Sequence, residues 1–132
     1  MNRHLELKSN FQMVQEFHDK FGIKQATLDN EDAQELRLDL IKEELNEVED
    51  ELCPLVFPPI VKSRLAKELA DLLYVVYGTA VTFDIPIDKV FHLVHESNMS
   101  KLGNDGKPVY REDGKVTKGP NYKPPDLSWL DE

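Results

Sequence analysis

The chain has almost no cysteine and no long apolar run. Cys53 is the single cysteine among 132 residues, so a disulfide framework within the chain is excluded and a reducing compartment is expected. No stretch of about 18 apolar residues occurs, which predicts no membrane span. The first ten residues also lack the apolar core of a secretory signal. A cytoplasmic protein is therefore expected.

Basic residues are scarce between residues 28 and 52. That segment holds eleven acids and only two bases, Arg37 and Lys42, and it accounts for the entire net charge of −9. Dense negative charge repels phosphate backbones, so direct nucleic-acid binding is not expected. A phosphorylated small molecule can still approach such a segment when divalent cations lie between the two.

Helical periodicity dominates the first hundred residues and predicts an all-α fold. Gly22 and the prolines at positions 54, 58 and 59 interrupt the pattern. Helices are expected over about 5 or 9 to 21, 33–52, 60–83 and 86–101. Glycine and proline accumulate from residue 102 on, where a short hairpin across 109–117 or a floppy tail is expected. We predict one domain over 1–132, a bundle of four or five helices (core about 5–101) with a loop-rich C-terminal arm (about 102–132).

Apolar residues mark the expected core and one exposed face. The third predicted helix carries a stripe of Leu65, Leu69, Leu72, Val76 and Ala80. The spacing of Phe17 with Val14 and Phe21 also assigns Phe17 to the core. Three apolar residues of the third predicted helix lie opposite its stripe and predict exposed apolar surface: Tyr74, Tyr77 and Val81. Such a surface favours assembly with another chain.

Two predicted helices carry acid pairs at the same spacing, Glu44-x-x-Glu47 and Glu68-x-x-Asp71. Residues three apart lie on one face of a helix, and the wheel positions place these acids beside the apolar stripes. If the pairs converge, like charges about 4 Å apart repel by roughly 4 kcal/mol at an effective dielectric near 20. A divalent cation relieves that repulsion, and an all-oxygen ligand set favours Mg²⁺, with Mn²⁺ as a substitute.

Other uses of these residues remain open or are disfavoured. An acid pair at helical spacing also suits a plain solvated face, although the otherwise apolar third helix argues against that for Glu68 and Asp71. No Glu-x-x-His pair is present, which disfavours a di-iron centre. His92-x-x-His95 lacks the further ligands of a complete zinc set. No Walker or dinucleotide-binding glycine motif occurs.

The four acids, with twenty residues between the pairs, resemble the metal motif of the MazG-like all-α nucleoside triphosphate pyrophosphohydrolases. Phosphoribosyl-ATP pyrophosphohydrolase and dimeric dUTPase are relatives of that family. Asn98-x-x-Lys101 matches the family's Asn-x-x-Lys element. The arm around Asp113-Gly114-Lys115 and residues 118–122 is similar to that of small, often phage-encoded members, which would place the chain in a host cytoplasm.

The resemblance implies a Mg²⁺-dependent hydrolase that converts a nucleoside triphosphate to the monophosphate and pyrophosphate. It implies Glu44, Glu47, Glu68 and Asp71 as metal ligands, with a catalytic role for Glu44. Glu43, adjacent to these acids, is a candidate general base or a residue that orients the ligands. Expected substrate contacts are Asn98, Lys101, Lys115, Lys118, Tyr122 and His18. Simple exposure for Glu43, a helix cap for Asn98 and Lys101, and an ordinary turn for the arm residues are the alternatives. The resemblance also implies a homo-oligomer, a dimer or a tetramer.

Substrate identity and functional class stay open at this point. The phage-like arm favours a purine deoxynucleotide such as dGTP, by association only. Phosphoribosyl-ATP and dUTP or dCTP are alternative substrates, and a non-catalytic acidic module that binds a basic partner is the alternative from another class. The sequence does not indicate which phosphorus is attacked, how many ions bind, how large the oligomer is or which pathway is served.

Overall fold

The structure is a computed structural model that describes residues 7–53 and 59–132. The chain divides into two compact units, Met1–Ile85 and Pro86–Glu132, and each is described by itself. The predicted break at Pro54 and Pro58, and the earlier of the two predicted helix starts, lie outside the described residues. The assignment of residues 1–132 to a single domain stays a prediction.

The first unit consists of three helices, α1 (Asn10–Lys20), α2 (Glu31–Leu52) and α3 (Lys62–Thr82). Ser9 caps α1 through a reciprocal pair of bonds, because its Oγ accepts from the Gln12 amide at 3.1 Å and its own amide donates to the Gln12 side chain. This selects the later of the two predicted starts. Gly22 follows α1 with φ of 69°, as expected of a residue that ends a helix.

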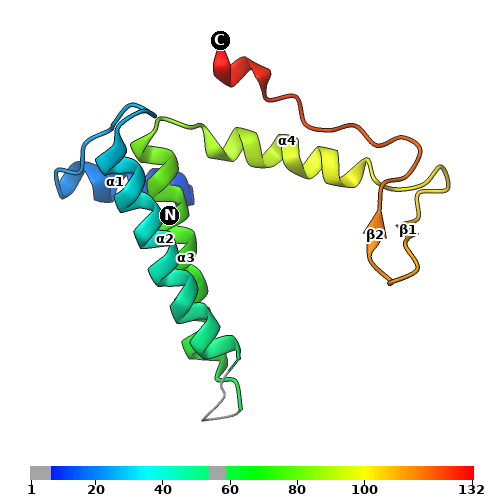
Figure 1. Cartoon of the computed structure of the whole chain (residues 1–132), viewed down its shortest axis with the longest axis horizontal. Helices are drawn as coiled ribbons and strands as arrows, with labels where there is room; N and C mark the ends of the chain where they lie inside the picture. The colour runs from blue at the N-terminus through cyan, green and yellow to red at the C-terminus, as the bar shows by residue number, and fades with distance from the viewer. Residues whose placement is uncertain (1–6, 54–58) are drawn as a thin grey trace, which may run out of the picture. The chain divides into compact units, whose positions relative to one another are not determined.

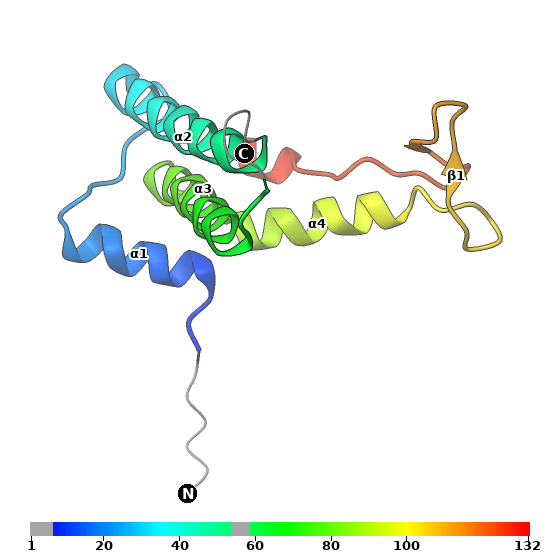
Figure 2. The ribbon, with the colours of Figure 1, turned by 90° about the horizontal axis from the view of Figure 1, so that it is seen from below.

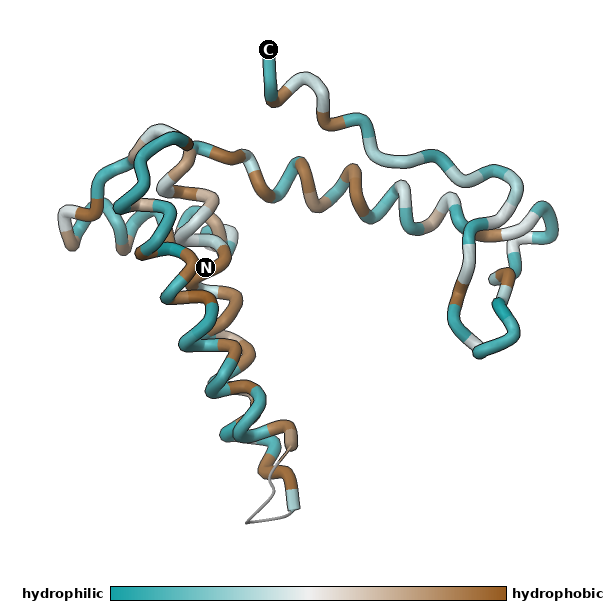
Figure 3. Tube along the Cα trace, viewed as in Figure 1, coloured by the Kyte–Doolittle hydropathy of each residue, from teal (hydrophilic) through white to brown (hydrophobic). Residues whose placement is uncertain are grey.

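In the first unit, α2 and α3 run antiparallel, and α1 lies against α3 (Figures 1 and 2). The apolar core between them is small. Among the described residues, the buried apolar side chains are Val14, Val48, Ala80 and Val81. Apolar residues follow α3 along its whole length (Figure 3), yet Leu69 and Val76 of the predicted stripe are exposed. Three helices alone cannot cover both sides of α3, so much apolar surface stays open.

Besides Leu69 and Val76, two further assignments of apolar residues were wrong. Phe17 is exposed and does not belong to the core; it stacks on Phe21 at a ring distance of 4.3 Å and meets Tyr74 edge-on. Val81 is buried, not exposed. Both errors have one cause: helical spacing gives the relative direction of side chains, whereas the side of the helix that is covered depends on where the neighbouring helices pack.

The second unit contains α4 (Ile87–Met99), the strands β1 (Val109–Tyr110) and β2 (Val116–Thr117), and a short 3-10 helix (Ser128–Asp131). The strands pair antiparallel around a turn in which Gly114 has φ of 83°, so the predicted hairpin is confirmed. The segment after β2 returns to the end of α4, where Gly119 donates to the Lys101 carbonyl at 2.9 Å and Ser97 donates to the Lys123 carbonyl at 2.7 Å.

The described residues contain four α-helices and one two-stranded hairpin, so the predicted all-α class is confirmed. None of these helices is by itself long and apolar enough to cross a membrane. Only α3 and α4 taken together have the length and composition of a span, and a break separates them.

Candidate functional site

Three of the four predicted metal ligands come together in the first unit. Glu44 of α2 and Glu68 and Asp71 of α3 each offer a carboxylate oxygen, and these oxygens lie within 4.8 Å of one another. All three residues are half-buried. Glu68 and Asp71 share a face of α3 because they are three residues apart, and the antiparallel packing of α2 brings Glu44 to that face. We call these three side chains the carboxylate cluster.

The cluster is electrostatically crowded. Burial raises the pKa of Glu44, and so does repulsion by Asp71, Glu43, Glu47 and Glu68. Glu43 and Glu47 are exposed and do not belong to the three-carboxylate group, although both add negative charge beside it. Their predicted roles as general base and fourth ligand therefore stay predictions.

One basic residue meets the cluster, and our sequence analysis did not find it. The Lys67 ammonium lies 2.7 Å from Asp71 Oδ2 and 3.8 Å from Glu68 Oε1. The hydrogen bond to Asp71 and the charges of Asp71, Glu68 and Glu44 raise the pKa of Lys67. A signal was available, since Lys67 precedes Asp71 by four residues, the spacing of a helical ion pair.

The chemistry of these side chains fits a hard divalent cation. Ligand oxygens around Mg²⁺ lie at about 2.1 Å from the ion, hence within about 4.2 Å of one another. The oxygens of the cluster need to approach only slightly to meet that condition. Carboxylates without histidine or cysteine favour Mg²⁺ or Mn²⁺ over zinc or copper. The cluster can therefore hold one such ion, with water or phosphate oxygens as the other ligands.

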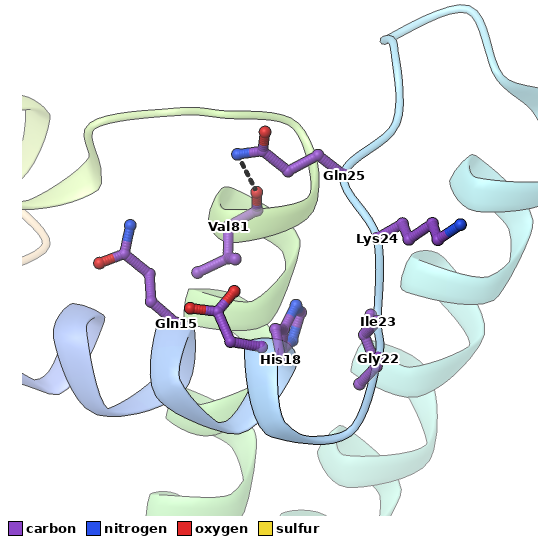
Figure 4. Close-up of a pocket in the computed structure, with 8 residues that line it drawn as sticks. Gln15, His18, Gly22, Ile23, Lys24, Gln25 and Val81 are labelled. Carbon is purple, nitrogen blue, oxygen red and sulfur yellow. Dashed lines mark hydrogen bonds between the residues drawn. The ribbon is translucent and has the colours of Figure 1, made fainter.

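A hollow of about 520 Å³ opens beside the C-terminal end of α1. Figure 4 shows that side chains of α1, of the loop that follows it and of α3 surround this hollow. His18 lines it and is only 4% exposed. Within the described part of the chain, His18 Nδ1 is buried and has no hydrogen-bond partner. Gln25 closes another side and donates to the Val81 carbonyl at 3.3 Å.

Arg37 of α2 lies behind His18 and is a second residue that the sequence analysis missed. Its side chain is buried and donates to the Val75 carbonyl at 3.0 Å and to Thr79 Oγ1 at 3.2 Å. No carboxylate of the described residues forms an ion pair with it. Burial lowers the pKa of His18, and the positive charge of Arg37 lowers it further. Both effects favour the neutral form of the His18 ring.

A glycine makes this arrangement possible. A Cβ atom at position 78 would lie 2.3 Å from Arg37 Nη2 and 3.1 Å from His18 Nε2. Gly78 thus allows α2 and α1 to place a guanidinium and an imidazole against the backbone of α3. The sequence offered a weak signal, because glycine inside a helix reduces stability unless something approaches closely.

The remaining predicted substrate contacts all belong to the second unit. Asn98 lies in the last turn of α4, and its carbonyl accepts from the Lys101 amide at 3.2 Å. The bond from Gly119 to Lys101 brings the arm to this helix end, where the Lys118 ammonium lies 4.7 Å from the centre of the Tyr122 ring. Lys115 follows the hairpin turn and is exposed. Lys101, Lys118 and Tyr122 are thus grouped within one unit, and their roles in binding stay predictions.

Comparison with known proteins identifies the family. The family described as phosphoribosyl-ATP pyrophosphohydrolase matches residues 14–98, a range that contains the whole carboxylate cluster and Asn98. An uncharacterized protein of Acanthamoeba polyphaga mimivirus is 32% identical over 124 residues, which cover 86% of this chain and 43% of the relative. The chain thus spans less than half the length of that curated relative. Because the family match covers more than half of its residues, the chain belongs to the phosphoribosyl-ATP pyrophosphohydrolase family.

Proposed function

We propose that the chain is a Mg²⁺-dependent nucleoside triphosphate pyrophosphohydrolase, which releases pyrophosphate and leaves the nucleoside monophosphate. The single observation that carries this proposal is the convergence of Glu44, Glu68 and Asp71 from two helices onto one point. Family membership supports the reaction type. A triphosphate and a cluster of carboxylates repel each other, so a divalent cation between them is needed for binding.

The residues of the cluster would act in binding and positioning. In this proposal, Glu44, Glu68 and Asp71 hold the ion. Glu47 lies one turn from Glu44 and would act as a fourth ligand from the solvent side. When bound, Mg²⁺ would lower the pKa of an attacking water and neutralise charge on the phosphates. Glu43 is exposed beside the cluster and is our candidate to accept the proton of that water.

We assign the base of the nucleotide to the hollow next to His18. Asp71 and Val81 are ten residues apart on α3, which is roughly 15 Å along a helix, on the order of the length of an extended nucleotide. The hollow is lined by the amides of Gln15 and Gln25, which offer hydrogen bonds to a nucleobase, and by one acidic and one basic residue, Asp19 and Lys24. A purine deoxynucleotide such as dGTP is the substrate that we favour, on the resemblance of the arm alone.

The arm is assigned to the phosphates and the sugar. Lys101, Lys115 and Lys118 supply positive charge, while Asn98 and Tyr122 offer hydrogen bonds. Lys118 already lies over the Tyr122 ring, so both side chains belong to one small surface. We propose that this surface contacts the nucleotide.

A second substrate has direct support. The matching family is described by its action on phosphoribosyl-ATP, which carries the same triphosphate group on a larger nucleoside. Our proposal for the carboxylate cluster applies to both substrates unchanged. The two candidate substrates differ only in the nucleoside that carries the triphosphate, so they must be separated by experiment.

We also propose that the chain acts as a homo-oligomer, a dimer or a tetramer. The first unit buries few apolar side chains, and Leu69, Leu73, Tyr74 and Val76 of α3 are exposed to water. Exposed apolar surface of this extent favours association. Sedimentation or light scattering tests the proposal, and a monomer at micromolar concentration would contradict it.

Product analysis tests the proposed reaction. The purified chain is incubated with a panel of ribo- and deoxynucleoside triphosphates and with phosphoribosyl-ATP, with Mg²⁺ and with chelator. We expect monophosphate and pyrophosphate from one or a few substrates, and no product with chelator. Glu44→Gln and Asp71→Asn should each lower turnover by about 100-fold, because each removes the negative charge of a metal ligand.

Glu49→Gln is the matched control, because it removes an exposed acid of the same helix, α2, outside the cluster. Its turnover should stay close to that of the parent chain. Turnover of phosphoribosyl-ATP alone would reassign the substrate within the family. No turnover of any substrate with Mg²⁺ or Mn²⁺ would refute the enzyme proposal and favour an acidic interaction module.

A further inference from the structure

Among the described residues, Lys67 is the base that forms ion pairs with the carboxylate cluster. Its ammonium contacts two of the three carboxylates, Asp71 at 2.7 Å and Glu68 at 3.8 Å. These are the side chains whose oxygens, with one of Glu44, would surround a divalent cation. An ammonium and a metal ion therefore compete for the same oxygen atoms.

We propose that Lys67 is a tethered counter-ion of the carboxylate cluster, which occupies it in the metal-free chain and is displaced when a divalent cation binds. This inference rests on the proposed metal site. Lys67 reduces the repulsion among the acids, so the empty cluster is tolerated without an ion. The same contact weakens metal binding, because it must be broken first.

The structure also explains why displacement is easy. The Lys67 side chain is 71% exposed, and its bonds to Asp71 and Glu68 are the ion pairs that it forms with described residues. The ammonium can swing into water about a flexible four-carbon stem. An exposed ion pair changes an equilibrium constant by no more than about fivefold. Lys67 is therefore expected to adjust the metal affinity, not to block the site.

Contact must be distinguished from the general effect of a nearby positive charge. Residue 66 is an exposed alanine, and it lies about 100° further round α3 than residue 67. The double substitution Ala66→Lys with Lys67→Ala keeps the composition and the net charge of the helix. The new lysine at position 66 lies on a different face of α3. The residue four positions after it is Ala70, not Asp71.

The test is a titration of the full chain with Mn²⁺ alone, without nucleotide. Electron paramagnetic resonance of the free ion gives the binding affinity. We expect Lys67→Gln to bind Mn²⁺ about two- to fivefold tighter than the parent chain. The exchanged variant should bind as tightly as Lys67→Gln, because it lacks the contact. Lys67→Arg keeps charge and reach and should bind like the parent, as should Lys62→Gln, which removes an exposed lysine elsewhere on α3.

Each outcome separates this inference from the proposed function. Equal affinities of the parent chain and of Lys67→Gln would refute the inference and leave the metal site intact. An exchanged variant that binds like the parent would show that charge alone matters, and would also refute it. Failure of every variant to bind Mn²⁺ would refute both the metal site and the role of Lys67.

Discussion

The packing of Arg37 against Gly78 leads to a prediction that can be worked out from atomic positions. In Gly78→Ala, the added methyl group would lie 2.3 Å from Arg37 Nη2, 3.2 Å from Arg37 Cζ and 3.1 Å from His18 Nε2. The shortest of these distances is far below van der Waals contact, so the guanidinium must move. Arg37 is buried and bonded to Val75 and Thr79, so the movement breaks at least one of these bonds.

The expected change in unfolding free energy combines a destabilising effect, the clash with Arg37, and a stabilising effect, the higher helix propensity of alanine. Extra volume in a packed interior destabilises by about 1–3 kcal/mol, and a lost bond to a charged donor costs about 1.5–3 kcal/mol. These two descriptions cover the same event and are not added. Alanine gains about 0.5–1 kcal/mol over glycine inside a helix. We therefore expect Gly78→Ala to lower the free energy of unfolding by about 1–2 kcal/mol, and Tm by several degrees.

The assay is urea unfolding followed by circular dichroism, with a double-mutant cycle. In an Arg37→Ala background the main obstacle is absent, so Gly78→Ala should cost far less there or should stabilise the chain through helix propensity. A substitution that is neutral in the parent chain would refute the contact. An equal cost in both backgrounds would show that Arg37 is not the reason for the glycine.

Three further predictions concern charge and backbone geometry. Without metal, Glu44→Gln should stabilise the folded chain by a few tenths of a kcal/mol at pH 7, because the folded-state pKa of Glu44 is raised. Urea midpoints should show that this gain in stability vanishes below the ordinary carboxyl pKa of 4.5. Saturating Mg²⁺ should reverse the order of stability, because it stabilises only the parent chain. Because the pKa of His18 is lowered below 6.5 in the folded chain, the stability of the folded chain should fall as the pH drops through 6.5. Urea midpoints of His18→Asn between pH 7.5 and 5 should show less of this loss. An unchanged pH dependence of the midpoint would contradict the lowered pKa of His18. Gly22→Ala should lower the unfolding free energy by about 1 kcal/mol by the same assay, since φ is 69° there, and a neutral effect would argue against the left-handed conformation.

Local signals predicted most of the secondary structure. Ser9 and Gly22 act at the ends of α1 through bonds or dihedral angles that involve only near neighbours. The Asn30 cap was missed, and α2 therefore begins two residues earlier than predicted. The hairpin between Val109 and Thr117 likewise depends on a glycine turn. Each of these features involves residues that are close in the chain, so a sequence pattern suffices to find it.

The candidate site was predicted only in part. The spacing of the acid pairs correctly placed Glu68 and Asp71 on one face, but it made Glu44 and Glu47 equivalent partners. In the structure, Glu44 joins the cluster and Glu47 stays exposed. The angular position of a residue on its own helix cannot distinguish them, because the distinction depends on which turn of α2 meets Glu68 and Asp71.

The sequence by itself determined the helical class, the helix ends, the hairpin, the two acid pairs and the resemblance to a pyrophosphohydrolase family. Tertiary structure alone decided that Glu44 completes the cluster and that Phe17 is exposed. Tertiary packing also brought Arg37 and His18 to Gly78, although each of them is about forty or more positions from Gly78 in the sequence. The reason is physical: period and caps act within one helix, whereas the contacts between helices depend on their packing and register, which no local pattern encodes.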